Sequence, residues 1–171
     1  MIRTEQCPDY PHVDQMLKRA FKTGEEARLV EGLRASQDYI PELSLVYETD
    51  GSIAGHILFS EASVQEDSSI YRVAALGPLA VDPAFQRSGI GSALMKEGLE
   101  RCRSYGFPLV FLLGHPEYYP RFGFLPARRY GFELKQFQVS DDVFMVCELE
   151  PGALDRLQGE FRFSSVFESL H

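Results

Sequence analysis

The spacing of hydrophobic residues predicts two helices near the start of the chain. Residues 2–6 form a short strand candidate, and Asp9 with Pro11 then opens the first helix. Its apolar positions recur at the spacing of one helical face: Val13, Met16, Leu17, Ala20 and Phe21. A second helix is expected over residues 25–35.

Apolar runs in the next part of the chain predict a sheet. Residues 43–48 and 52–60 are two strand candidates joined by Thr49-Asp50-Gly51, and Asp-Gly between such runs predicts an antiparallel hairpin. Residues 71–81, "YRVAALGPLAV", are expected to form the central strand, with Gly77-Pro78 interrupting its ladder. The acidic run "SVQEDSS", residues 63–69, is expected to be a solvated loop.

The pattern then changes from strand to helix and back. A helix is expected from Gly89 to about Tyr105, ended by Gly106. Residues 108–114, "PLVFLLG", follow as a buried strand, parallel to the central strand if the helix makes a right-handed crossover. A helical turn near residues 117–122 and strands near 131–134 and 144–149 complete the pattern. The expected fold is a mixed α/β domain over residues 1–171.

Composition and charge narrow the functional classes. The chain has 171 residues, 44% of them hydrophobic, which suits one globular core. Its formal net charge of -8 disfavours a nucleic-acid partner and suits a cationic one. No signal peptide or apolar stretch of membrane-spanning length is present, and Cys7, Cys102 and Cys147 share no metal-ligand spacing. We therefore expect a cytoplasmic protein with reduced cysteines, no bound metal and no membrane contact.

Two glycines at the start of the third predicted helix point to an anion site. In "SGIGS", residues 88–92, Gly89 and Gly91 leave the first backbone N–H groups of a helix open to a phosphate, and Arg87 can add a charged hydrogen bond. The run lacks the Gly-Lys-Ser/Thr of a P-loop and the third glycine of a dinucleotide fingerprint. The alternative is that the glycines serve only close packing of strand on helix.

The motif "QRSGIG" resembles the Gln/Arg-x-x-Gly-x-Gly/Ala pattern of the GNAT superfamily of N-acetyltransferases, with Gln86, Gly89 and Gly91 at the defining positions. The preceding "LGPLAVDPAF" is similar to that family's splayed central strand, and "YYPRFGF", residues 118–124, resembles its Phe-Tyr-x-x-x-Gly-Phe segment. Two further stretches, "GHPEYYPRFGF" and "FMVCELEPGAL", are similar to bacterial YhbS-like acetyltransferases, in which an Asp is expected where His115 stands.

The resemblance implies an acyl-CoA N-acyltransferase fold, a mostly antiparallel sheet with a splayed parallel strand pair and flanking helices. It implies acetyl-CoA as cosubstrate and direct transfer of the acetyl group to a primary amine of a small molecule or protein. A homodimer is also compatible with it. Tyr119 matches the family's tyrosine and is the expected general acid for the leaving thiolate. The residues expected to bind the cosubstrate are Leu79, Ala80, Val81, Gln86, Arg87, Ser88, Gly89, Ile90, Gly91 and Ser92.

The base that takes the amine proton is not specified by the sequence. The central strand contains no carboxylate, which leaves Glu61, His115, Glu117 or an ordered water. His56 lies within an apolar strand and is expected to be a core histidine. Two functional alternatives also remain, which are a non-catalytic acyl-CoA sensor or interaction module and the transfer of a longer acyl group.

Overall fold

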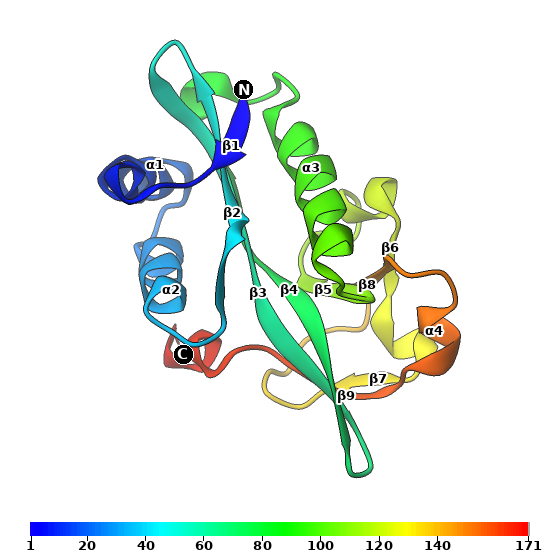
Figure 1. Cartoon of the computed structure of the whole chain (residues 1–171). Coiled ribbons are helices and arrows are strands. Elements are labelled where there is room, and N and C mark those ends of the chain that lie inside the picture. The colour runs from blue at the N-terminus through cyan, green and yellow to red at the C-terminus, as the bar shows by residue number, and fades with distance from the viewer. Residues whose placement is uncertain (171) are drawn as a thin grey trace.

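The computed structural model describes residues 1–170, and within them nine strands form one mixed sheet with helices on both faces (Figure 1). The strands are β1 Ile2–Thr4, β2 Tyr39–Thr49, β3 Ser52–Glu66, β4 Ser69–Val81, β5 Leu109–Leu113, β6 Phe124–Pro126, β7 Phe132–Leu134, β8 Phe144–Glu148 and β9 Gly159–Arg162. The α-helices are α1 Tyr10–Ala20, α2 Glu25–Arg34, α3 Ile90–Tyr105 and α4 Ala153–Arg156. Short 3-10 turns cover Cys7–Asp9, Pro83–Phe85, Tyr119–Phe122, Ala127–Tyr130 and Ser165–Leu170.

The sheet is mostly antiparallel, as the family resemblance implies. Its strand order is β1-β2-β3-β4-β5-β8-β6, and β9 pairs with β3 and β7. The pairs β4–β5 and β7–β9 are parallel, and every other pair is antiparallel among the described residues. The crossover from β4 to β5 runs through α3, which confirms the predicted parallel pair at the centre of the sheet.

A bulge in β4 separates it from β5. Ile57 and Phe59 of β3 have one residue between them, whereas their partners Leu79 and Leu76 have two, Gly77 and Pro78. The extra residue confirms the predicted irregularity and reverses the alternation of side chains along the strand. Ladder pairs between β4 and β5 stop at Ala75–Phe111 within the described residues, although β4 continues to Val81. The two strands therefore diverge from the bulge onward.

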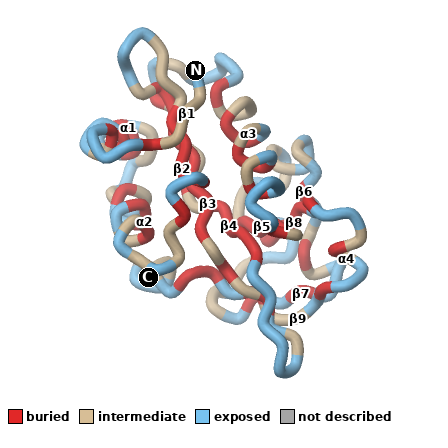
Figure 2. Tube along the Cα trace, in the orientation of Figure 1, coloured by how far each residue is buried: buried red, intermediate tan, exposed pale blue. Residues whose placement is uncertain are grey.

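Helices cover the two faces of the sheet, each through a different hydrophobic cluster. Figure 2 shows the buried stretches of the central strands that lie between these helices. The first cluster joins α3 to one face, through Leu94, Met95 and the fully buried Phe59. The second joins α1 and α2 to the other face, where Leu58 and Ala80 lie. A third cluster joins β5 and the strands after it to the C-terminal segment, by which we mean residues 159–170. Four of its phenylalanines are fully buried: Phe111, Phe132, Phe144 and Phe161.

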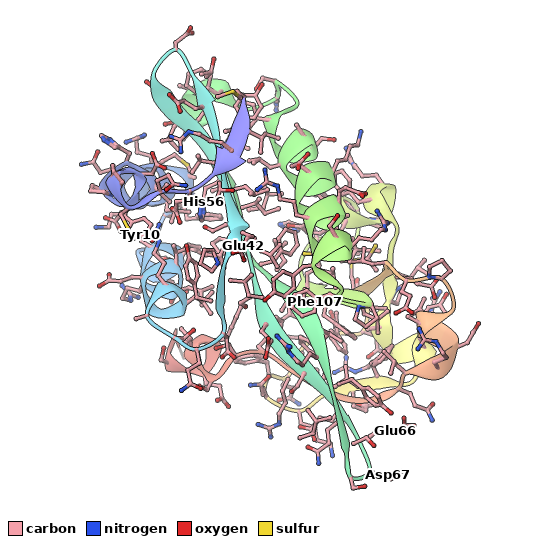
Figure 3. All side chains as sticks on the ribbon, in the orientation of Figure 1. Tyr10, Glu42, His56, Glu66, Asp67 and Phe107 are labelled. Atoms are coloured by element: carbon pink, nitrogen blue, oxygen red, sulfur yellow. The ribbon has the colours of Figure 1, made fainter. Side chains whose placement is uncertain are left out.

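The expectation of a loop at residues 63–69 is wrong. β3 runs to Glu66 and β4 begins at Ser69, so the acidic run is mostly strand and only its tip turns, at Asp67 (Figure 3). β9 pairs with β3 here, with Val64 opposite Phe161, and Val64 is fully buried. A distant strand thus stabilises a stretch whose local composition is that of a loop.

A buried ionic network holds the N-terminal strands to α2. Glu5 is 5% exposed, and its carboxylate accepts hydrogen bonds from Arg34 at 2.5 Å and from the Ser44 hydroxyl at 2.8 Å. His56, fully buried on β3 as a core histidine, lies 3.5 Å from the same carboxylate. Burial raises the pKa of Glu5, but the hydrogen bonds and charges of His56 and Arg34 outweigh it and lower the pKa to about 2.

This network predicts a stability change in acid. Because the pKa of Glu5 falls from 4.5 to about 2 on folding, ionised Glu5 stabilises the fold above pH 4.5, and this contribution is lost as the pH falls through 2. We expect Glu5→Gln to lower the free energy of unfolding by about 3 kcal/mol at pH 7. Urea unfolding at pH 7, 5, 4 and 3 should show this difference shrinking below pH 4.5. The exposed Glu42 gives the control Glu42→Gln, and a Glu5→Gln deficit independent of pH would contradict the assignment.

Candidate active site

The loop after β4 is held in place by three side chains. Asp82 accepts hydrogen bonds from the Ala84 backbone N–H at 3.0 Å and from Arg19 of α1 at 2.6 Å. Burial raises the pKa of Asp82, but these two partners lower it overall, so its carboxylate stays charged. The Gln86 amide donates to the Val81 carbonyl at 3.4 Å, and the Ser88 hydroxyl donates to the Phe85 carbonyl.

The loop leads into α3 through two residues in the left-handed region. Arg87 has a φ of 65° and Gly89, the N-cap, has a φ of 85°. The first intrahelical donor is Ala93, whose N–H bonds the Gly89 carbonyl at 3.0 Å. The N–H groups that precede it, from Ile90 to Ser92, have no partner within the helix. These N–H groups lie at the N-terminal end of α3, where the helix dipole is positive, and this end of a helix favours the binding of an anion.

A pocket of about 560 Å³, which we call the loop pocket, opens at this helix start. It is lined by eight of the ten residues predicted to bind the cosubstrate: Leu79, Val81, Gln86, Arg87, Gly89, Ile90, Gly91 and Ser92. The other two lie outside the lining. Ala80 alternates to the opposite face, where it packs against the α1 and α2 cluster, and Ser88 is exposed beside the pocket.

Two residues that sequence reasoning missed form the opposite wall of the loop pocket. Tyr118 lies across from the helix start, since a Cβ added at Gly91 would be 3.3 Å from its hydroxyl. Arg121 stacks on the Tyr118 ring, with its guanidinium carbon 4.6 Å from the ring centroid. Arg87 and Arg121 together place two exposed guanidinium groups at this pocket, although the whole chain has a formal net charge of -8. Arg121, the basic residue inside "YYPRFGF", is the sequence feature that could have indicated this wall of the pocket.

Tyr119 is fixed by its neighbours. Its ring lies directly against the backbone of Gly114, because a Cβ added there would be 2.3 Å from the ring carbon Cε2. It also meets Tyr118 edge to face, with centroids 5.1 Å apart. Burial, with a smaller effect of Tyr118, raises the pKa of Tyr119 to about 12. The phenol therefore keeps its proton at neutral pH and is a donor there.

A second pocket of about 340 Å³, which we call the apolar pocket, lies where β4 and β5 diverge. Its walls come from Phe21 just after α1, from α2, from the β4 bulge, from the end of β5 and from the C-terminal residues Phe163 and Phe167. Leu79 and Tyr119 line both pockets, so the two cavities approach each other at these side chains. A group bound in the loop pocket and a group bound in the apolar pocket would therefore meet beside the Tyr119 ring.

The candidates for the base are not equivalent in the structure. His115 lines the apolar pocket, whereas Glu61 accepts hydrogen bonds from Arg72 on the outer part of the sheet and lines neither pocket. Glu117 is exposed and also lines neither pocket. Glu26 of α2, which the sequence did not single out, lines the apolar pocket.

Residues 1–170 contain no group of three or more His, Cys, Asp or Glu side chains arranged to hold a metal ion. Nor do they contain a helix with the length and apolarity that a membrane crossing requires.

Comparison with known sequences identifies relatives of this chain. The profile of the acetyltransferase (GNAT) family matches residues 5–124. The chain is 32% identical over 168 residues to the uncharacterised N-acetyltransferase YhbS of Escherichia coli K12, and the aligned region covers 98% of each chain. It is 39% identical over 119 residues to the uncharacterised N-acetyltransferase YjhQ of the same organism, and this aligned region covers 70% of this chain and 66% of YjhQ.

Solved structures agree with the sequence relatives. The crystal structure of Escherichia coli YhbS in complex with CoA matches with a TM-score of 0.90 and 31% identity, covering 98% of this chain and 91% of that one. A GNAT family acetyltransferase from Brucella melitensis in complex with acetyl-CoA matches with a TM-score of 0.78 and 31% identity, covering 98% and 97%. From the matched profile, the near full-length relatives and the shared fold, we conclude that this chain belongs to the acetyltransferase (GNAT) family.

Proposed function

We propose that this protein is an acetyl-CoA-dependent N-acetyltransferase that transfers an acetyl group directly to a primary amine. The observation that supports direct transfer is the approach of the loop pocket and the apolar pocket at Leu79 and Tyr119. One substrate can enter from each side of the sheet where β4 and β5 diverge, so no covalent enzyme intermediate is needed. The free cysteines Cys7, Cys102 and Cys147 suit a reducing cytoplasm.

The loop pocket has the chemistry that a nucleoside diphosphate thioester requires. Gly89 has open space where a side chain would stand, and Gly91 leaves room between Val81 and the Tyr118 hydroxyl. The helix N–H groups can donate to the diphosphate, and Arg87 and Arg121 can neutralise its charge. The structures of two relatives in complex with CoA and acetyl-CoA support this use of the pocket.

The residues at the junction can perform the steps of transfer. Acetyl-CoA supplies the thioester, and the N–H groups of Leu79 and Val81, which alternate with the β3-paired Ala80 and Asp82, are the proposed donors to its carbonyl oxygen as negative charge grows there. The nitrogen of the neutral amine forms a bond to the acetyl carbon, the carbon–sulfur bond breaks, and one proton leaves the nitrogen. An amine that arrives as an ammonium gives up a further proton to solvent before it attacks. His115 lines the pocket through which the amine enters, which favours it over Glu61 and Glu117 as the acceptor of that proton.

Tyr119 is the proposed proton donor to the departing sulfur. With its pKa raised to about 12, the phenol is protonated throughout the physiological range and holds a hydrogen bond ready for the thiolate. The same pKa lies above the value of about 8.5 that is usual for a thiol, so the proton transfer is not strongly driven. We therefore assign Tyr119 a contribution at the low end of general acid catalysis.

Gly91→Val tests the phosphate cradle. The added side chain would contact the Tyr118 hydroxyl and Val81, and would cover the helix N–H groups, so we expect the Kd for CoA to rise by at least about 30-fold. Isothermal titration with CoA gives the affinity. Ser104→Val places the same residue at an exposed position near the other end of α3 and should leave the affinity unchanged. Tight CoA binding by Gly91→Val would contradict the cradle.

Tyr119→Phe tests the proposed role of Tyr119 as the general acid. We expect kcat for release of CoA thiol to fall by about 100-fold, with little change in the KM for acetyl-CoA, since only the hydroxyl is lost. Thiol release over a panel of amines measures this. Equal rates in the two proteins would remove Tyr119 from the mechanism. CoA binding without turnover on any amine would favour a sensor.

Gly114→Ala tests how Tyr119 is positioned. Because the new Cβ would collide with the Tyr119 ring, the hydroxyl must move, and we expect kcat to fall about tenfold or more while CoA still binds. If Gly114 acts through Tyr119, the double variant Gly114→Ala/Tyr119→Phe should be no slower than Tyr119→Phe alone. Additive losses in the double variant would mean that Gly114 serves the fold rather than the tyrosine.

A further inference from the structure

The walls of the apolar pocket are hydrocarbon from several directions. Phe21 approaches from the segment after α1 and Leu29 from α2. Leu76 and Pro78 approach from the β4 bulge, and Leu113 from the end of β5. Phe163 and Phe167 close it from the C-terminal segment. Water in such a pocket is easily displaced by an apolar group, because few lining atoms can hydrogen-bond to it.

The C-terminal wall is held in place by stacked rings. Phe161 stacks on Phe111 of β5 with centroids 4.3 Å apart, and Phe163 meets Phe161 edge to face at 4.7 Å. Phe167 in turn packs on Phe163 at 4.5 Å. Phe163 is 5% exposed, whereas Phe167 is half-buried at the pocket. Because the sheet supports the wall, a ligand would find its surface already formed.

The ionisable groups at the pocket set the charge of the occupant. Besides the Tyr119 phenol, the lining holds one carboxylate, Glu26, one imidazole, His115, and no Lys or Arg among its described residues. Glu26 accepts a hydrogen bond from the Thr23 hydroxyl at 3.3 Å and has no ion-pair partner in the described part of the chain. It can therefore receive one ammonium, whereas the hydrocarbon that makes up most of the lining offers no partner to a second cation or to a carboxylate on the acceptor.

From these walls and charges we infer that the acceptor is a small primary monoamine that carries an apolar group, rather than a polyamine, an amino acid or a protein chain. The inference rests on the proposed function. The amine lies toward Leu79 and Tyr119, where the loop pocket begins, and the apolar group fills the space between the bulge and the phenylalanines. A volume of about 340 Å³ suits a small molecule.

A matched series of amines tests this class by binding as well as by turnover. We would titrate propylamine, pentylamine and hexylamine into the CoA-loaded protein, together with 1,6-diaminohexane and 6-aminohexanoate. Affinity should rise about fourfold for each added methylene. The diamine and the amino acid, which match hexylamine in chain length, should bind at least about tenfold more weakly than hexylamine. The order of kcat/KM with acetyl-CoA should be the same, and peptides with a free N-terminus or a lysine should be poorer acceptors than hexylamine.

Variants separate the two parts of the pocket. Glu26→Gln should weaken all three alkylamines by about tenfold while leaving their dependence on chain length intact. Glu25→Gln is the matched control, since Glu25 is the exposed neighbour on α2 and does not line the pocket. Phe167→Ser should instead flatten the dependence on chain length. If that variant does not fold, the wild-type series and the Glu26→Gln result still decide the question.

The outcomes distinguish this inference from the proposed function. Affinity that does not change with chain length, a diamine that binds as tightly as hexylamine, or a peptide that is the better substrate would overturn the amine class and leave acetyl transfer standing. Chain-length-dependent binding without thiol release from acetyl-CoA on any amine would uphold the pocket's preference and overturn the proposed transferase activity.

Discussion

The single extra residue in β4 at Gly77-Pro78 is the constraint on which the site depends. Proline cannot donate to the ladder, and the extra residue shifts the alternation, so the strand beyond the bulge turns Leu79 and Val81 toward α3 while Ala80 faces α1 and α2. With β5 paired to β4 only before the bulge among the described residues, the sheet opens at its centre. Both pockets and the tyrosine between them occupy that opening.

Close packing keeps this opening in a defined shape. Tyr119 lies where it does because Gly114 has no side chain, and Gly98 likewise allows α3 to approach the sheet, since a Cβ there would be 2.4 Å from the Phe59 ring. On the other face, the buried contacts among Glu5, Arg34 and His56 join α2 to the N-terminal strands. The position of Tyr119 is thus set by a contact at its own ring, and the packing of α2 and α3 on the sheet is set by contacts farther away.

Local features were predictable from the sequence, and long-range ones were not. The hairpin at Asp50-Gly51, the irregularity at Gly77-Pro78 and the glycine start of α3 each depend on backbone preferences written into a few adjacent residues. Residues 63–66 pair with the start of β4 on one side, and residues 63–65 also pair with β9, almost a hundred residues later; no local pattern indicates that second pairing. For the same reason the sequence indicated the loop pocket but not Tyr118 and Arg121 across from it, nor Glu26 and Phe167 at the apolar pocket.

The two pockets draw on different parts of the chain. The loop pocket is built from residues 79–92 and 118–121, whereas five of the thirteen residues that line the apolar pocket come from residues 21–29 and 163–167. Under the proposed function, substitutions in these outer segments would reshape acceptor selectivity while leaving the proposed phosphate cradle intact. The proposed arrangement would then let the choice of acceptor diverge among descendants of one ancestral scaffold, and it would offer engineers a compact set of positions for redirecting the enzyme to new acceptors.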